Sequence, residues 1–250
     1  MPQNRYIPSD AGIIQPVREK GDPEVGPDAL MVLIPSVLDY LVRLTEGERV
    51  QTNGNGWVRL YRATVGSRSP LTLSGPFLGA PHAVIGMEKL IVLGAKRIWV
   101  LGWCGALQAD LKIGQLLIPT GAISEEGTSA HYPISGRPIE STATLNLMLE
   151  ETLKQRQLPF SKGRVWTTDA LYRETPEKVK AHKKSGVLAV EMEMSALMTV
   201  AIFRSIAMAG LLVVSDQLVD LTWRPGFSKP ALRKHSRDAG EVLLRLAGSL

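Results

Sequence analysis

The sequence predicts an α/β protein, in which helices cover both faces of a mainly parallel central sheet as a three-layer α/β/α sandwich. Short, continuous apolar runs recur along the chain, and such runs are typical of strands buried on both faces. Segments with apolar residues at helical spacing lie between these runs, and strands that alternate with helices favour parallel pairing. Because no linker-like segment interrupts residues 29–250, we expect a single domain there.

The chain before this domain has a different character. Residues 1–28 contain five prolines and no apolar periodicity, so we expect an extended N-terminal arm outside the core. In the domain, the expected strands lie at 29–34, 57–64, 71–74, 98–101, 115–123, 163–168, 187–190 and 210–215. The expected helices lie at 35–44, 82–93, 140–157, 176–184, 194–207 and 229–247. A strong turn signal occupies residues 53–56, and polar loops at 124–138 and 169–174 are of the kind that often carries function.

The composition is that of a globular protein. Of the 250 residues, 44% are apolar and 21% are charged, which allows a sizeable core. The single cysteine, Cys104, cannot form a disulfide within the chain, so we expect a reducing compartment, with the cytoplasm as the default. The sequence has neither an apolar run of membrane-spanning length nor the apolar centre of a signal peptide. We therefore expect neither membrane insertion nor export.

The charge of the chain favours a small polar or anionic ligand. The net charge is +5, and two basic clusters, at 178–184 and 229–237, are expected on solvated helix faces. Aromatic residues are not interleaved with them, which argues against nucleic acid as a partner. The four histidines are scattered, and neither a CxxC nor an HExxH pattern is present. We expect no metal and no organic cofactor.

The central feature is the segment 187–201, because its apolar period changes partway through. Val187 to Val190 form a continuous apolar run, and helical spacing begins at Met194. Glu191 and Glu193 stand between the two, on one side of an extended backbone. Carboxylates at the carboxyl end of a buried strand lie where open α/β sheets bind ligands. The alternative is structural, since glutamate also favours the first turn of a helix.

Several segments in this order resemble the nucleoside phosphorylase type I family, which contains purine nucleoside and uridine phosphorylases. The segments are Val190-Glu191-Met192-Glu193 followed by Ser195 and Ala196, the stretch 94–106 followed by 113–119, Val213 to Asp216, and 75–86. The resemblance extends from about Ala29 to the C-terminus. It implies an enzyme that cleaves the N-glycosidic bond of a nucleoside, and a homo-oligomer such as a dimer, trimer or hexamer.

The resemblance also implies roles for residues at the two strand ends. Glu193 matches the carboxylate that binds the ribose hydroxyls and stabilises the cationic sugar, and Met192 and Glu191 flank it in the ribose-binding segment. Ser215 and Asp216 match the pair that supplies the acid for a purine base, where a raised pKa would let Asp216 protonate the leaving nitrogen. The competing interpretation is that Asp216 only caps the next segment.

A second set of positions is expected at the base. Tyr172 and Arg173 lie in the loop with which relatives contact the base. The chain has no match for the glutamine and arginine that read uracil in uridine phosphorylases, so a purine nucleoside is favoured over a pyrimidine one.

The phosphate site is where the chain departs from the family. Relatives have a Gly-Asp-Pro-x-Arg segment after the first strand, and this chain has 34–38, Ile-Pro-Ser-Val-Leu. Val100 stands at the position of a second arginine, Trp103 replaces a serine or threonine, and the position of a neighbouring subunit's arginine falls near 54–57, where no arginine occurs. We expect Gly79, Val100, Gly102 and Trp103 to line the pocket at this former phosphate site.

Three functions therefore stay open. Loss of the arginines removes bidentate donors that a buried phosphate needs, which puts ordinary phosphorolysis in question. The first hypothesis is cleavage of a purine nucleoside in the family's glycosidic-bond class, with phosphate as an uncertain co-substrate. The second is a nucleosidase that uses water, and the third is a protein that binds nucleosides without cleaving them.

Overall fold

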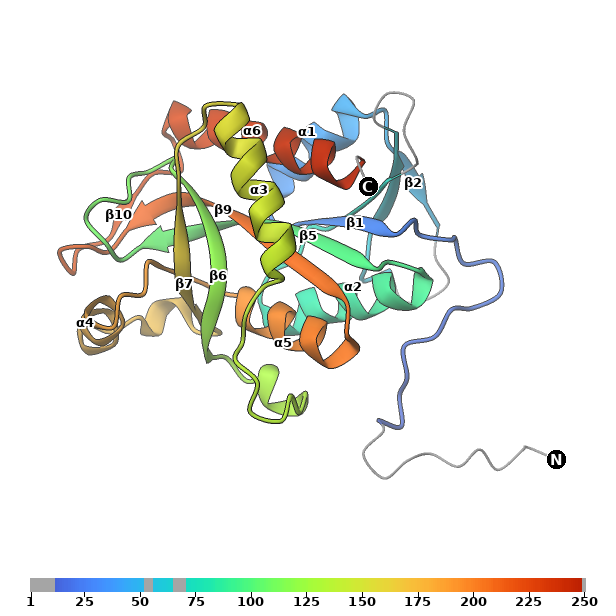
Figure 1. The fold of residues 1–250 in the computed structure, drawn as a ribbon, viewed down its shortest axis with the longest axis horizontal. Coiled ribbons are helices and arrows are strands. Elements are labelled where there is room, and N and C mark those ends of the chain that lie inside the picture. The colour runs from blue at the N-terminus through green and yellow to red at the C-terminus, as the bar shows by residue number, and fades with distance from the viewer. Residues whose placement is uncertain (1–11, 52–55, 65–70, 249–250) are drawn as a thin grey trace.

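The computed structural model describes residues 12–51, 56–64 and 71–248. Within them the chain forms a central sheet with helices on both sides (Figure 1). The strands are β1 (Asp28–Val32), β2 (Glu48–Val50), β3 (Leu60–Ala63), β4 (Leu71–Ser74), β5 (Arg97–Ala106), β6 (Leu116–Glu125), β7 (Phe160–Thr168), β8 (Ala189–Glu191), β9 (Ala207–Gln217) and β10 (Arg224–Pro225). The helices are α1 (Pro35–Leu44), α2 (Ala80–Leu93), α3 (Ala143–Gln155), α4 (Pro176–Lys184), α5 (Met194–Arg204) and α6 (Pro230–Ala247), with short 3₁₀ turns η1 (Ser129–His131) and η2 (Leu171–Arg173).

The sheet combines an open part with a closed ring. The strand order is β10-β9-β6-β7-β8-β5-β1-β4-β3-β2, and β9 also pairs with β5, so β5, β9, β6, β7 and β8 close on themselves. Parallel pairing joins β1 to β4 and β5, β5 to β9, and β7 to β6 and β8. Antiparallel pairing joins β2, β3 and β4, and also β5 to β8 and β6 to β9. The predicted α/β class is confirmed, with a mixed sheet at its centre.

Two hydrophobic clusters separate the layers. Helices α1, α3 and α6 lie on one side of the sheet and α2 and α5 on the other, as Figure 1 shows. Alternate residues of β5 point to opposite sides, so Val100 belongs to the α2–α5 cluster and Leu101 to the α1–α3–α6 cluster. This alternation decides which side of the sheet each functional residue of β5 faces.

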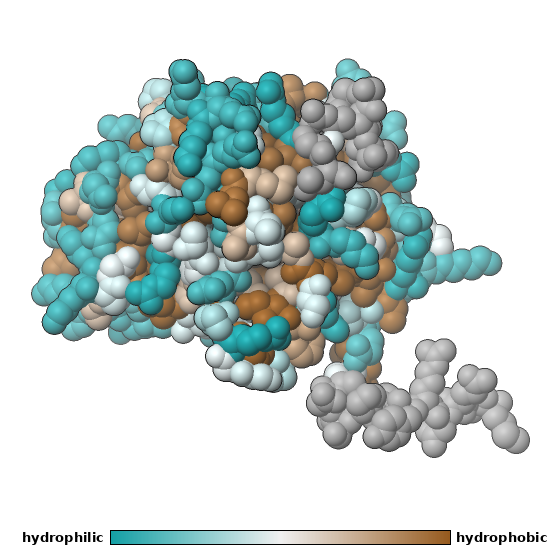
Figure 2. Space-filling view, viewed as in Figure 1, coloured by the Kyte–Doolittle hydropathy of each residue, from teal (hydrophilic) through white to brown (hydrophobic). Residues whose placement is uncertain are grey.

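The surface is mixed in character. In the space-filling view, hydrophilic and hydrophobic residues both appear over α3, and hydrophobic residues also reach the surface near α2 and α5 (Figure 2). Ile85 of α2 and Phe203 of α5 are exposed, at 43% and 37% respectively. No helix in the described part of the chain is long and apolar enough to cross a membrane.

The N-terminal arm is extended, and part of it packs on the domain. Residues 12–27 contain no helix or strand. Asp22 is nevertheless buried and pairs with Lys89 of α2 at 2.6 Å, and the Val25 N–H donates to the Leu93 carbonyl. The chain therefore contacts the core before β1 begins. The expected turn at 53–56 lies mostly outside the described residues.

Candidate active site

Two acid-bearing strands flank one glycine at the carboxyl end of β5. Gly105 pairs with Val190 of β8 on one side and with Asp216 of β9 on the other, beside a register shift in β5. A Cβ atom at position 105 would lie 3.0 Å from Asp216 Oδ2 and 3.3 Å from Val190 Cγ1. Glycine therefore lets the two strands approach β5 closely at the point where their acids stand. Glu191 directly follows Val190.

Glu191 is committed to the start of helix α5. Its Oε2 accepts hydrogen bonds from the backbone N–H groups of Glu193 and Met194, both at 2.7 Å. Its Oε1 accepts from the hydroxyl of Thr167 in β7, and the residue is only 5% exposed. The carboxylate thus satisfies N–H groups that a helix start leaves free. These hydrogen bonds give Glu191 the kind of structural role at a helix start that the sequence left open as the alternative.

Glu193 points elsewhere and contacts the start of helix α2. Its Oε1 accepts a hydrogen bond of 2.6 Å from the N–H of Gly79, the residue that precedes α2. Gly79 has a φ of 78°, a conformation that glycine adopts readily. The Gly79 N–H, expected at the former phosphate site, donates to Glu193 in this structure. Met192, between the two glutamates, is half-buried.

The two glutamates share a dry environment. Burial raises the pKa of Glu191 well above its usual range, and the charge of nearby Glu193 raises it further. Burial likewise raises the pKa of Glu193, and the Gly79 N–H opposes this shift. Like charges so close disfavour ionisation of both carboxyls together. The ionisation of this pair therefore depends strongly on burial and on nearby charges.

Asp216 has two hydrogen-bond donors. The hydroxyl of Ser215 donates to Oδ1 at 2.6 Å, and the indole Nε1 of Trp223 donates to Oδ2 at 3.0 Å. Ser215 is buried and also contacts the carbonyl oxygen of Cys104, whereas Asp216 is half-buried. The aspartate therefore lies at the end of β9, where a tryptophan from the following loop donates to it. Trp223 was not among the expected site residues.

The loop before helix α4 contributes a different residue from those expected. Tyr172 is 95% exposed and Arg173 is also exposed, so neither is held against the acids. Glu174 is half-buried: burial raises its pKa to about 7, and the charge of Asp216 contributes to the rise. Glu174 was not among the expected site residues, because nothing in its sequence context distinguishes it from an exposed loop acid.

Hydrogen bonds through the Thr167 and Ser195 hydroxyls connect the glutamate segment to neighbouring strands. The hydroxyl of Thr167 donates a hydrogen bond to Glu191. Its oxygen accepts a second hydrogen bond from the Ser195 N–H at 2.9 Å. The Ser195 hydroxyl donates to Glu126 at 2.9 Å, and all four side chains are buried. Ends of β6, β7 and β8 are thereby tied to the first turn of α5. Thr167 and Glu126 were not predicted, since their relation to Glu191 is visible only in the folded chain.

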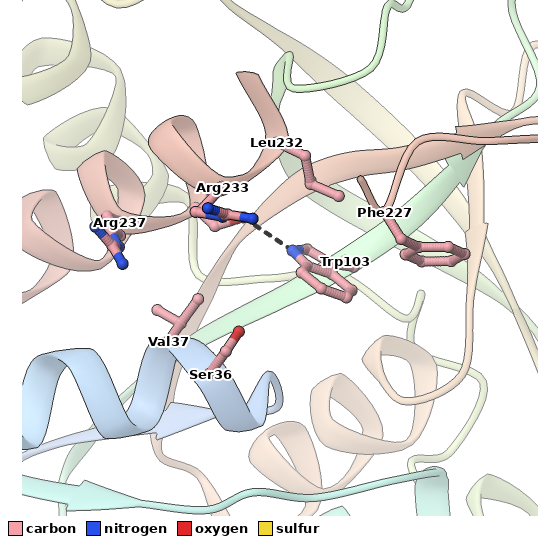
Figure 3. A pocket seen from close by; sticks show the side chains of 8 residues that line it. Ser36, Val37, Trp103, Phe227, Leu232, Arg233 and Arg237 are labelled. Atoms are coloured by element: carbon pink, nitrogen blue, oxygen red, sulfur yellow. Dashed lines mark hydrogen bonds between the residues drawn. The ribbon is translucent and has the colours of Figure 1, made fainter. Parts of the chain in front are cut away.

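Of the four positions expected to line one phosphate pocket, Trp103 faces a different layer from Val100. Val100 is fully buried in the core, and Gly102 fits between Leu33 and Leu212, where a Cβ would lie 2.9 Å from Leu33 Cδ1. Trp103 projects to the opposite side of the sheet and lines a separate cavity (Figure 3). Strand alternation explains this result, because positions 100 and 103 face different layers.

Three basic residues that could have replaced the missing arginines have other contacts. Arg137 donates through Nε to the Ile134 carbonyl and through Nη2 to the Ile202 carbonyl. Arg164 donates to the Ser185 carbonyl at 2.9 Å, and Arg173 is exposed. The neighbouring-subunit position near 54–57 lies partly outside the described residues. Among the described residues, no group of three or more His, Cys, Asp or Glu side chains could hold a metal ion.

Solved structures share the fold and so define its class. Purine nucleoside phosphorylase from Toxoplasma gondii in complex with immucillin-H matches with a TM-score of 0.81 at 23% identity, over 95% of this chain and 98% of that one. Uridine phosphorylase from Vibrio fischeri ES114, complexed with 6-hydroxy-1-naphthoic acid, matches with a TM-score of 0.77 at 24% identity, over 88% and 90%. The architecture is thus that of the nucleoside phosphorylase fold.

Sequence comparison then establishes the family. The family model described as the Phosphorylase superfamily matches residues 29–247, and the chain belongs to this family, as a member of nucleoside phosphorylase type I. A guanosine phosphorylase from Halorubrum lacusprofundi is 28% identical over 176 residues, 70% of this chain and 73% of the relative. A DeoD-type purine nucleoside phosphorylase from Myxococcus xanthus is 30% identical over 180 residues, 71% and 74% of the two chains.

Proposed function

We propose that the protein cleaves the N-glycosidic bond of a purine-type nucleoside. One observation carries the proposal: β8, which leads into Glu193, and β9, which carries Asp216, flank the same glycine, Gly105. Two carboxyls at neighbouring strand ends suit a reaction that needs one group on the sugar and one on the base. The family to which the chain belongs supports an enzymatic role.

Glu193 binds the sugar in this proposal. Its carboxylate is oriented by the Gly79 N–H, and a carboxylate accepts several hydrogen bonds, so capacity remains for the ribose hydroxyls. A negative charge at this position stabilises the positive charge that develops on the sugar ring as the bond breaks. Met192 packs against the sugar, and Glu191 acts indirectly by holding the first turn of α5.

Asp216 serves the base. A carboxyl that protonates the departing base nitrogen makes the base a better leaving group, and Ser215 orients that carboxyl through its hydroxyl. The Trp223 indole occupies Oδ2, so a base that uses this oxygen displaces the indole. Purine preference is supported by the Ser215-Asp216 pair and by the guanosine and purine nucleoside phosphorylases among the relatives.

The nucleophile separates the proposal from its nearest alternative. Phosphate is the nucleophile proposed here. Hydrolysis is the second candidate, because Val100 and Leu38, at positions where relatives have arginines, are buried in apolar surroundings. We further propose a cytoplasmic homo-oligomer, for which the exposed apolar residues near α2 and α5 offer contact surface.

One experiment distinguishes the functions. The protein is incubated with inosine, adenosine, guanosine and uridine, each with and without phosphate, and release of the free base is followed. Phosphate-dependent release from the purine nucleosides is expected. Phosphate-independent release would support a nucleosidase, and binding without release would support a non-catalytic protein. Faster release from uridine than from all three purine nucleosides would contradict the purine assignment.

A further inference from the structure

A cavity lies on the side of the sheet opposite helices α2 and α5, and none of the acidic residues described above lines it. It has a volume of about 340 Å³ and lies between the first turn of α1 and the first half of α6, with Trp103 of β5 at its base (Figure 3). Ligand pockets span roughly 300 to 1,000 Å³, so this one fits a small group. Val37 and Leu232 supply apolar walls, and both are buried.

The cavity has a strongly positive lining. Arg233 and Arg237 are four residues apart on α6, so their side chains lie on one face of the helix, and both line the cavity. Neither forms an ion pair with a carboxylate among the described residues, whereas Lys234 between them pairs with Asp238 at 2.8 Å. No aspartate or glutamate lines the cavity. Two guanidinium groups thus line the cavity, and no carboxylate stands in its wall.

The geometry of the remaining lining favours an anion as well. The Arg237 guanidinium lies 4.8 Å from the centre of the Tyr40 ring, a contact that restricts its side chain. Ser36 offers a hydroxyl from the first turn of α1, which contains no acidic residue. The Trp103 indole Nε1 donates to the buried Ser236 hydroxyl at 2.9 Å, which fixes the ring at the base of the cavity.

The cavity connects to the acid site through aromatic rings. Trp103 and Phe227 lie 5.8 Å apart between ring centres, and Phe227 lies 6.3 Å from Trp223. Trp223 in turn donates to Asp216 at 3.0 Å. A ligand in the cavity is therefore separated from the catalytic acid by side chains of one loop, 218–229, between β9 and α6.

We propose that this cavity binds a phosphate group, with Arg233 and Arg237 as its principal ligands and Ser36 as a further donor. Guanidinium groups bind phosphate oxygens through paired, charge-assisted hydrogen bonds, and two of them match the charge of a dianion. The group comes either from inorganic phosphate or from a nucleotide. Because the cavity lies on the other side of the sheet from Glu193 and the start of α2, the inference assigns a separate anion site, not the site of the nucleophile, and it goes beyond the proposed function.

Calorimetric titration at constant ionic strength tests the site. The purified full chain is titrated with inorganic phosphate, with guanosine 5′-monophosphate and with guanosine. Arg233→Gln and Arg237→Gln should each weaken phosphate binding by roughly tenfold or more, since each removes charge-assisted bonds. Lys234→Gln, the matched control, removes the same charge from α6 outside the cavity and should change binding by less than about twofold.

The outcomes are separable from those of the cleavage assay. Tighter binding of inorganic phosphate than of the nucleotide identifies free phosphate as the ligand, and the reverse identifies a nucleotide. Binding of neither, or equal weakening by all three variants, overturns the site. If the arginine variants lose phosphate binding but the wild type cleaves no nucleoside, the site stands and the proposed function fails. If cleavage needs phosphate yet both arginine variants bind it normally, the site fails and the function stands.

Discussion

Two regions along β5 differ in charge, exposure and hydrogen bonding. At Gly105 the acids are buried or half-buried, and backbone N–H groups, a threonine hydroxyl and an indole hold them. At Trp103, two positions earlier, the cavity is open to solvent and lined by the exposed Arg233 and Arg237. Negative and positive groups are thus kept in separate places. The comparison shows how one strand can present two kinds of site.

The separation has a chemical consequence. A guanidinium group beside Glu191 and Glu193 would favour their charged forms, whereas their dry, cation-poor surroundings raise the pKa of both. A phosphate group has the opposite need, because it must be paired with cations. The four predictions below test the acid side of this contrast, and the phosphate titration described above tests the cationic side.

The largest effect is expected at Asp216. Asp216→Asn removes the proposed proton donor for the leaving base, and general acids contribute roughly 10²- to 10⁴-fold. We expect the kcat for base release to fall at least about a hundredfold. Steady-state kinetics with the most active purine nucleoside measures it. Asp220→Asn, which alters an exposed carboxylate paired with Arg224, is the control. A loss of less than about threefold in Asp216→Asn would assign this residue a structural role.

Glu193 gives the next largest effect. Glu193→Gln keeps the side-chain volume but removes the charge that we propose stabilises a cationic sugar, so kcat should fall at least roughly tenfold. The Gly79 N–H still finds an oxygen acceptor in the glutamine. The variant's thermal midpoint should therefore stay close to that of the wild type. Unchanged turnover would count against the assignment of this carboxylate to the sugar.

Thr167 tests the network that supports the acids. Thr167→Val removes a hydroxyl that donates to Glu191 and accepts from the Ser195 N–H. The buried Glu191 carboxylate and the Ser195 N–H each lose a hydrogen bond as a result. The free energy of unfolding, measured by urea denaturation, should fall by about 1–3 kcal/mol. Thr168→Val is the matched control, since its hydroxyl accepts one bond from Ala170. Equal losses in the two variants would show that the network has no special role.

The smallest effect is a dependence of stability on pH. The pKa of Glu174 is raised to about 7 in the folded protein, so the folded state binds more protons than the unfolded state between about pH 4.5 and 7. The free energy of unfolding should therefore decrease as pH rises through this window. Glu174→Gln should make that slope shallower, and Glu151→Gln, on the exposed side of α3, should not. A steeper slope in Glu174→Gln would contradict the raised value.

Local patterns predicted much of this fold. The change of period at 187–201 located β8, Glu191, Glu193 and α5, and the apolar run ending at Ser215 located β9 and Asp216. The short β2 and β10 were not expected, because three or two residues carry too little pattern. Closure of five strands into a ring was not predicted either, since it depends on pairings between distant segments.

The site was predictable only in part. Which glutamate starts the helix depends on Thr167, 24 residues earlier, and which loop residue faces Asp216 depends on the path of 169–174. The grouping of Val100 with Trp103 was wrong for a reason available in the sequence, because strand alternation puts them on opposite faces. Arg233 and Arg237 could not be connected with Trp103, since only the packing of α6 brings them together.

The most direct test of the central claim is the structure of the protein with a bound purine nucleoside. We expect the ribose hydroxyls within about 3 Å of the Glu193 carboxylate and a base nitrogen within about 3 Å of Asp216, with Trp223 displaced from Oδ2. A nucleoside that contacts only one of the two acids, or that binds in another part of the molecule, would contradict it.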